Sequence, residues 1–214
     1  MVWSGGSTSR RFGMPLASRS ALLAGCLVVN TVLAGDVVEL NVTDSRGVYS
    51  IDVMMRVHAP AAAVWQVLTD FTHIYRLNAS ITESEILPPP DETVMRVRTV
   101  VNDCVFVFCF DIERVEDVRN TDAGELVANV VTELSNIKSG TARWRILPDG
   151  NESYISYQGT IEPGFAVFPI IGDYLARLKL REETLLTLEN IERISRIEAG
   201  LDVDQESGIA ASVR

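Results

Sequence analysis

The stretch from residue 169 to residue 196, PIIGDYLARLKLREETLLTLENIERISR, is the feature that most constrains how this chain folds. It has no proline after its first residue and only one early glycine, and residues of high helix propensity dominate it. A helix of this length would be roughly 40 Å long, at about 1.5 Å per residue, and would cross a whole small domain. We predict one long amphipathic helix with Leu178 and Leu185 on its buried face. Its apolar residues recur at three- and four-residue steps: Ile171, Tyr174, Leu175, Leu178, Leu185 and Leu188.

Most of the chain before this helix has the pattern of β-strands. Apolar residues alternate cleanly from Tyr49 to Val57, and turn residues at 120–124 and 149–151 join consecutive strands. Consecutive strands on short turns predict an antiparallel meander, so the fold class is α+β, with the long helix covering one face of the sheet. The further predicted strands are 37–42, 81–87, 93–101, 104–115, 126–134, 140–147 and 153–161.

A short helix is predicted after the strand that ends at Val57, in the segment HAPAAAVWQVLTDF of residues 58–71. Pro60 suits a first helical position, and a second short helix is expected near residues 72–77. The apolar face of the first helix consists of Val64, Trp65, Leu68 and Phe71.

The pattern V-x-A-P-x-x-x-V-W-x-V-L-T-D-F, from Val57 to Phe71, resembles the START-related helix-grip superfamily (SRPBCC). Within it, the polyketide cyclase/dehydrase and coenzyme Q-binding START-domain group is the most similar, and the order of elements agrees over roughly residues 48–195. The resemblance implies a helix-grip fold, in which a curved antiparallel sheet wraps around a long C-terminal helix. The resemblance also implies that the ligand is hydrophobic. Members of the superfamily range from lipid carriers to aromatases, so the resemblance implies no single activity.

A curved sheet cannot fill its own concave side, so we expect a ligand cavity between the sheet and the long helix. Arg181 lies near the apolar face of that helix, where it would extend into solvent, pair with an acidic residue, or face the cavity and hold a polar ligand head. The apolar link of residues 165–171 is predicted at the cavity mouth, as a lid or a transient membrane contact; the alternative is a buried connection. For each apolar residue predicted to line the cavity, the alternative is that its side chain belongs to the hydrophobic core and contacts no ligand. The predicted lining residues are Met55, Phe108, Trp144, Tyr157, Phe165, Phe168, Tyr174 and Arg181.

Residues 1–34 have the pattern of a signal peptide. They contain three arginines and no acidic residue, then an apolar run that ends in Val32-Leu33-Ala34, a small-residue cleavage site. We therefore expect export, with a periplasmic location, a START-like domain at 35–197 and a flexible tail at 198–214. Two alternatives stay open: Leu23-Ala24-Gly25-Cys26 matches a lipobox that would lipidate Cys26, and the segment could remain as an uncleaved anchor.

The net charge of the chain limits the classes of molecule that it is expected to bind. The net charge is −10, and without residues 1–34 there would be 16 basic and 29 acidic residues. Such an acidic body argues against nucleic acid and against simple electrostatic docking to anionic lipid. A hydrophobic small molecule is the predicted partner, and the oligomeric state stays open.

Cys104 and Cys109 are the two cysteines that remain after export. Residues five apart in a regular strand point to opposite faces, but a turn or bulge near Asn102 and Asp103 would allow a disulfide. The alternative is two small buried apolar side chains. Two cysteines and two scattered histidines, His58 and His73, do not suggest a metal site.

No cofactor or catalytic residue is predicted, because the sequence lacks a nucleophile elbow, a phosphate loop and a dinucleotide fingerprint. We therefore predict a protein that binds or carries a lipid, a quinone or a polyketide-like molecule. The alternatives are a cyclase, dehydratase or hydrolase acting in the same cavity, and an envelope interaction module with a filled core.

Overall fold

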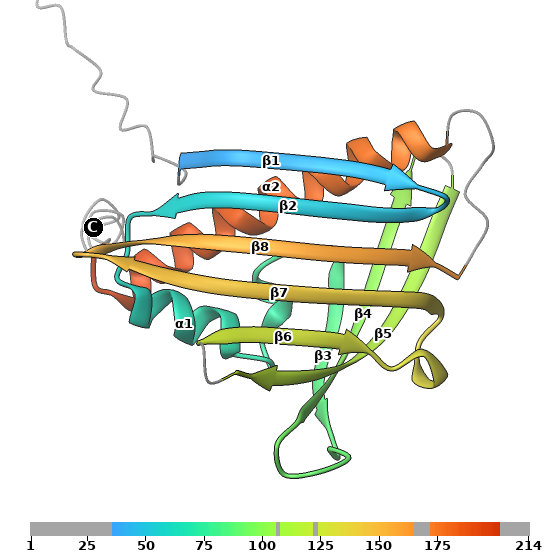
Figure 1. The fold of residues 1–214 in the computed structure, drawn as a ribbon, viewed down its shortest axis with the longest axis horizontal. Coiled ribbons are helices and arrows are strands. Elements are labelled where there is room, and N and C mark those ends of the chain that lie inside the picture. Colours follow the sequence, from blue (N-terminus) through green and yellow to red (C-terminus); the bar gives the residue numbers. More distant parts are fainter. Residues whose placement is uncertain (1–35, 106–107, 122–123, 165–171, 202–214) are drawn as a thin grey trace, which may run out of the picture. The chain divides into compact units, whose positions relative to one another are not determined.

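The structure is a computed structural model, and it describes residues 36–105, 108–121, 124–164 and 172–201. These described residues form eight strands, two α-helices and two short 3₁₀-helices, and Figure 1 shows how they are arranged. In chain order the elements are β1 (Asp36–Ser45), β2 (Val48–Val57), α1 (Ala61–Thr69), η1 (Ile74–Arg76), β3 (Ile81–Leu87), β4 (Met95–Val105), β5 (Phe108–Asn120), β6 (Glu125–Val130), η2 (Thr132–Leu134), β7 (Ile137–Asp149), β8 (Glu152–Pro163) and α2 (Gly172–Glu198).

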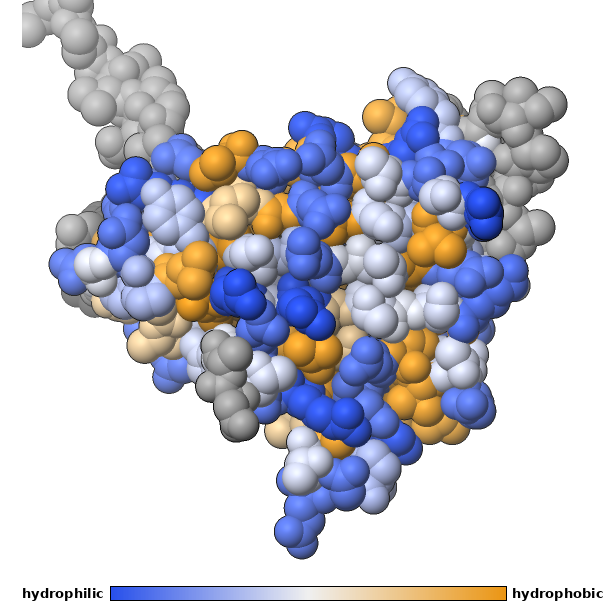
Figure 2. All heavy atoms as spheres, in the orientation of Figure 1, coloured by the Kyte–Doolittle hydropathy of each residue, from blue (hydrophilic) through white to orange (hydrophobic). Residues whose placement is uncertain are grey.

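The strands form one antiparallel sheet in the order β1-β2-β8-β7-β6-β5-β4-β3. The pairing of β2 with β8 brings the early and late parts of the chain together. In the view of Figure 1, β1, β2, β8 and β7 lie in front of α2, which crosses the inner face of the sheet. The outer face mixes hydrophilic with hydrophobic residues (Figure 2), as expected for a surface in water. The predicted helix-grip fold is confirmed.

The main core lies on the inner face, where α1 and the C-terminal half of α2 pack on β2 and β8. Met55 and Ile155 are directly opposite each other across these strands, and both are buried. Helix α1 contributes Val64, Val67 and Leu68, which recur at the spacing of one helical face. A smaller cluster consists of Val97, Val118, Leu126 and Ala128, against which Trp65 and Phe71 pack.

The buried face of α2 differs from the predicted one. Leu188, Ile191 and Ile194 are buried, whereas Leu178 is 47% exposed and Leu185 is only partly buried. The prediction for Leu178 was wrong because leucines occur on more than one face of this helix, so periodicity alone did not select the face that meets the sheet. Apart from Gly172, the buried residues of α2 begin at Leu188.

Two strand predictions also need correction. The expected break at residues 102–103 is absent from β4, which continues to Val105 and places Cys104 opposite Cys109 in β5. The strand predicted to end at 134 ends at Val130, because the chain then forms η2. The segment around η2 remains hydrogen-bonded to β5, where Ser135 Oγ accepts a hydrogen bond from the Val115 backbone N–H.

Within the described ranges, neither α-helix combines the length and the apolar character that a membrane span requires.

Candidate functional site

A small cavity of about 80 Å³ lies on the inner face of the sheet, further along β2 and β8 than Met55 and Ile155. Leu180 of α2 covers it, and its lining includes the small residues Gly140, Ala142 and Gly159. The lining residues are Ile51, Arg114, Glu116, Val130, Ile137, Gly140, Thr141, Ala142, Tyr157, Gly159, Thr160, Ile161 and Leu180.

Two charged residues of β5 reach this cavity. Arg114 and Glu116 are two positions apart and so lie on one face of the strand, with Arg114 Nε 3.1 Å from Glu116 Oε2. Their side chains are 32% and 13% exposed. Thr99 lies opposite Arg114 on β4 and is 1% exposed.

The polar groups on this face are not all satisfied. Within the described residues, neither Arg114 Nε nor Thr99 Oγ1 has a hydrogen-bond partner, because the contact of Arg114 with Glu116 has the distance of an ion pair but not the angles of a hydrogen bond. Buried polar groups nearly always have partners, and each exception calls for an explanation such as an absent ligand or water. Of these two residues, Arg114 lines the cavity, so its Nε could donate to a polar group placed there.

Tyr157 is the aromatic residue of the cavity. It lies opposite Trp144 in β7, and the two ring centroids are 4.2 Å apart at an interplanar angle of 36°. Burial raises the pKa of Tyr157 to about 12, with smaller opposing effects from Arg114 and Glu116. The phenol is therefore neutral at neutral pH and keeps a hydroxyl that can donate to a ligand.

The other predicted lining residues lie elsewhere. Trp144 stacks beside Tyr157, but Met55 is 1% exposed in the main core and does not border the cavity. Tyr174 is 58% exposed, and Arg181 Nη1 donates to the carbonyl oxygen of Leu40 at 3.0 Å, on edge strand β1. Both lie outside the cavity, contrary to the prediction, because α2 turns a different face to the sheet. The side chain of Phe108, together with Phe165, Phe168, Cys26 and the link 165–171, falls outside what the structure describes.

Arg114, Glu116 and Thr99 were not predicted, although the sequence contained a signal for the first two. The alternation that predicts inward positions for Phe108 and Phe110 predicts the same for every second residue after them, including Arg114 and Glu116. Charged residues at inward positions of a strand are unusual, and they indicate a candidate site in the same way as a sequence motif does.

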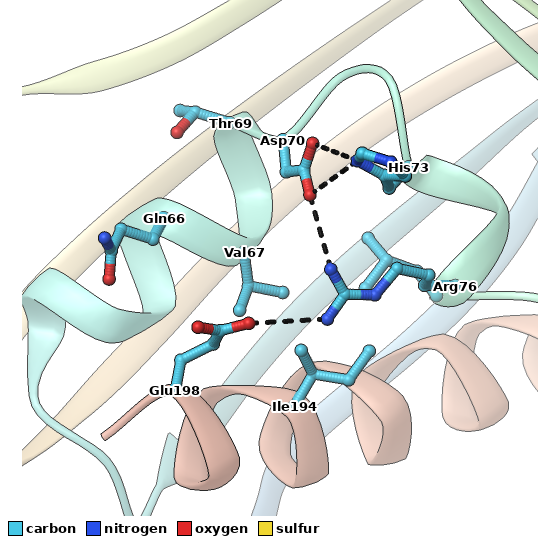
Figure 3. A pocket seen from close by; sticks show the side chains of 9 residues that line it. Gln66, Val67, Thr69, Asp70, His73, Arg76, Ile194 and Glu198 are labelled. Atoms are coloured by element: carbon cyan, nitrogen blue, oxygen red, sulfur yellow. Dashed lines mark hydrogen bonds and ion pairs between the residues drawn. The ribbon is translucent and has the colours of Figure 1, made fainter. Parts of the chain in front are cut away.

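A larger pocket, of about 310 Å³, lies outside the sheet between α1, η1 and the end of α2 (Figure 3). His73 Nδ1 is 2.7 Å from Asp70 Oδ1, and Arg76 is 3.4 Å from Asp70 and 3.5 Å from Glu198. Although burial acts in the opposite direction, hydrogen bonds from His73 and Thr72 lower the pKa of Asp70. These charged groups are paired with one another, whereas Arg114 Nε of the inner cavity has no hydrogen-bond partner in the described part of the chain. The inner cavity is therefore the better candidate for a ligand site.

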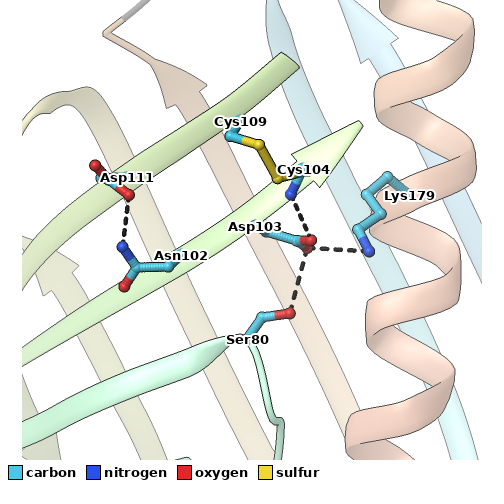
Figure 4. Close-up of a disulfide and its surroundings, with 7 residues drawn as sticks. All are labelled: Ser80, Asn102, Asp103, Cys104, Cys109, Asp111 and Lys179. Carbon is cyan, nitrogen blue, oxygen red and sulfur yellow. Dashed lines mark hydrogen bonds and ion pairs between the residues drawn. A yellow bond between two sulfur atoms is a disulfide. The ribbon is translucent and has the colours of Figure 1, made fainter. Parts of the chain in front are cut away.

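A disulfide and a polar cluster hold the cavity end of the β4–β5 hairpin against α2. Cys104 and Cys109 are joined by a disulfide, where the sequence had left free thiols as the alternative. Next to it, Asp103 Oδ2 accepts from Lys179 of α2 at 3.1 Å and from Ser80 Oγ at 3.3 Å (Figure 4). In the described ranges no group of three or more His, Cys, Asp or Glu side chains is arranged to hold a metal ion.

The family of polyketide cyclase / dehydrase and lipid transport proteins has a sequence model that matches residues 49–188. The chain belongs to this family. The match covers β2 to β8 apart from Val48, helix α1, helix α2 up to Leu188 and the whole inner cavity, so the START-related resemblance is confirmed. No curated protein matches the sequence.

Solved structures of other START-related proteins share the fold of this family member. The Zhui aromatase/cyclase from Streptomyces sp. R1128 is 15% identical, with a TM-score of 0.58, over 72% of this chain and 98% of its own. A STAR-related lipid transfer protein from Xanthomonas axonopodis is 17% identical, with a TM-score of 0.55, over 73% and 98%. Human STARD10 is 10% identical, with a TM-score of 0.55, over 78% of each chain. At these identities the similarity concerns the fold alone.

Proposed function

We propose that this family member binds a hydrophobic small molecule with a polar acceptor group, such as a fatty acid or a quinone, without changing it chemically. The observation that carries the proposal is Arg114 Nε, which has no hydrogen-bond partner among the described residues and belongs to a cavity otherwise lined largely by apolar and small residues. An ionised donor forms the stronger hydrogen bond, so Arg114 would select a carbonyl or carboxylate head. The apolar lining would contribute about 25 cal/mol for each Å² of ligand surface that it covers.

The cavity must expand to accept such a ligand, because about 80 Å³ is well below the roughly 300–1,000 Å³ of ligand pockets. The N-terminal half of α2 is the part that would move. Polar contacts hold it: Tyr49 donates to Asp173 at 2.7 Å, Arg177 pairs with Asp44, and Lys179 pairs with Asp103. The ion pairs of Arg177 and Lys179 are partly exposed, and such pairs cost less to break than the contacts of the buried leucine and isoleucines of the other half.

Export is part of the proposal, supported by the basic opening, the apolar run and the cleavage site before Gly35. The ligand would then be bound in the periplasm. N-terminal sequencing of the mature protein should begin at Gly35, whereas a diacylated Cys26 at the mature N-terminus would establish a lipoprotein instead.

The binding test is a titration with a fluorescent fatty acid and with a ubiquinone analogue. Arg114→Lys keeps a positive charge beside Glu116 but loses the planar guanidinium, and we expect it to bind at least about tenfold more weakly, or about 1.4 kcal/mol. Arg76→Lys in the outer pocket is the matched control and should bind like the wild type. Equal binding by all three proteins would contradict the role of Arg114, and no binding of either probe would favour the module with a filled core.

A cyclase or dehydratase is the second candidate, because three titratable side chains converge on the cavity: Arg114, Glu116 and Tyr157. The name of the family includes these activities. Mass spectrometry of a poly-β-ketone probe recovered from the protein distinguishes the two functions. A product formed by the wild type but not by Glu116→Gln would establish the enzyme, and an unchanged probe supports the binding protein.

A further inference from the structure

We infer that Tyr157, whose hydroxyl end lies over Gly159, sets the depth of the inner cavity and so determines the bulk of the ligand that fits. The inference rests on the proposed function, because selection by bulk requires a ligand. The position of the ring, in contrast, is testable without one.

The contact between the two residues is unusually close. A Cβ atom built on Gly159 would lie 2.1 Å from the hydroxyl oxygen of Tyr157, 2.6 Å from Cζ and 3.1 Å from Cε1. Contacts under 3.0 Å essentially never occur for real Cβ atoms, so any other residue at position 159 would displace the ring. The backbone of Gly159 does not have a positive φ, and the space for the ring is therefore the reason that glycine is needed here.

The ring is also held from the side. Trp144 stacks against Tyr157 and itself packs on both hydrophobic clusters, so it offers a fixed wall. Tyr157 is thus confined between β8 below and Trp144 beside it, and it borders the cavity under Leu180. In this position the phenol ring is the floor of the cavity rather than an obstacle within it.

Two substitutions change the height of this floor in opposite directions. Gly159→Ala places a methyl group under the ring and lifts it into the cavity, and the displaced atoms are the far end of a side chain that can rotate. Tyr157→Ala removes the floor and deepens the cavity, whereas Tyr157→Phe keeps the ring and so keeps the depth. Tyr154→Ala is the matched control, because Tyr154 lies on the same strand but on the outer face of the sheet.

The binding experiment uses anilinonaphthalene sulfonate and its bulkier dimer, both of which join an apolar body to an anionic head. We expect Gly159→Ala to bind the smaller probe at least about tenfold more weakly than the wild type, about 1.4 kcal/mol. Tyr157→Ala should shift the preference towards the dimer by a similar factor. Tyr157→Phe, which loses only the hydroxyl, should keep the wild-type preference between the two probes, and Tyr154→Ala should match the wild type. Unchanged binding by Gly159→Ala would overturn the inference alone, whereas a wild type that binds neither these probes nor the fatty acid and quinone would overturn the proposed function.

The position of the ring is measured by NMR on the ligand-free protein. The Hε protons of Tyr157 should give NOEs to the Gly159 Hα protons. In Tyr157→Ala these NOEs should be lost and the Hα chemical shifts should change. The absence of these NOEs in the wild type would overturn the inference whatever the binding data show.

Discussion

The two ends of the inner face are built on the same strands and under the same helix, yet one is filled and the other is hollow. At the filled end, Met55 and Ile155 meet Leu188 and Ile191, and each of these side chains is fully or almost fully buried. At the hollow end, the same strands carry Ile51 and Gly159, which border the cavity beneath Leu180. Residue size and charge, rather than the path of the backbone, decide which end of this sheet is core and which is site.

The two ends are also held together by different forces. Helix α1 covers only the filled end, where apolar burial dominates. At the hollow end the helix is attached through ion pairs and hydrogen bonds, including those of Lys179 and Asp173. Stability should therefore depend mainly on the filled end and ligand binding on the hollow one.

The largest expected effect is at the filled end. Leu188→Ala removes most of a side chain that is 2% exposed, and we expect it to lower the free energy of unfolding by about 2–5 kcal/mol. Leu178→Ala, on the exposed face of the same helix, should change it by less than about 0.5 kcal/mol. Urea unfolding measures both. Equal losses would mean that α2 is oriented differently from the structure.

The next effect concerns the ion pair at the hollow end. Arg114→Met leaves the Glu116 carboxylate largely buried without its partner, and we expect a loss of about 2–3 kcal/mol, somewhat below the value for a fully buried pair. The double variant Arg114→Met/Glu116→Met should recover most of this loss. Arg76→Met in the outer pocket should cost less than about 1 kcal/mol, because its pairs are more exposed. A loss in the double variant as large as in the single one would contradict this account.

The disulfide at the hollow end should have a slightly smaller effect. Chain entropy predicts that a disulfide closing so short a loop, between Cys104 and Cys109, stabilises the protein by about 2 kcal/mol. The double variant Cys104→Ser/Cys109→Ser should therefore have a free energy of unfolding lower by about 2 kcal/mol, measured by denaturant unfolding. Thiol titration of the unfolded, unreduced mature protein checks the bond directly. Two titrating thiols would show that the cysteines are free.

The smallest effect belongs to the polar rim of the filled end. Because the pKa of Asp70 is lower in the folded protein than in the unfolded chain, its stabilising contribution is fully present above the unfolded pKa, about 3.9, and is lost as the pH falls through the lower folded pKa. Asp70→Asn should therefore weaken the protein slightly at pH 6 and show a shallower further loss below about pH 4. Urea midpoints measured from pH 6 to pH 2 test this, and parallel curves for the two proteins would contradict it.

The sequence by itself determined the class of the fold. Alternation in the strands, short turns and the long helix predicted an antiparallel sheet gripping a C-terminal helix, and the segment from Val57 to Phe71 identified the family. Each of these signals is local, since it depends on residues close together in the chain. For the same reason Tyr157 and Trp144 were placed on the inner face correctly: period two in a strand assigns a face without knowledge of its neighbours.

Only the tertiary structure decided which part of the inner face is a site. In the structure α2 is oriented so that Leu178, Tyr174 and Arg181 lie outside the interior, unlike in the prediction. Several faces of this helix carry leucines, and only contact with the sheet determines which face is buried. The juxtaposition of Arg114 with Thr99, and of Tyr157 with Gly159, depends on how strands and side chains meet in space. Whether a buried donor has a partner is a property of that packing, and no pattern along the chain contains it.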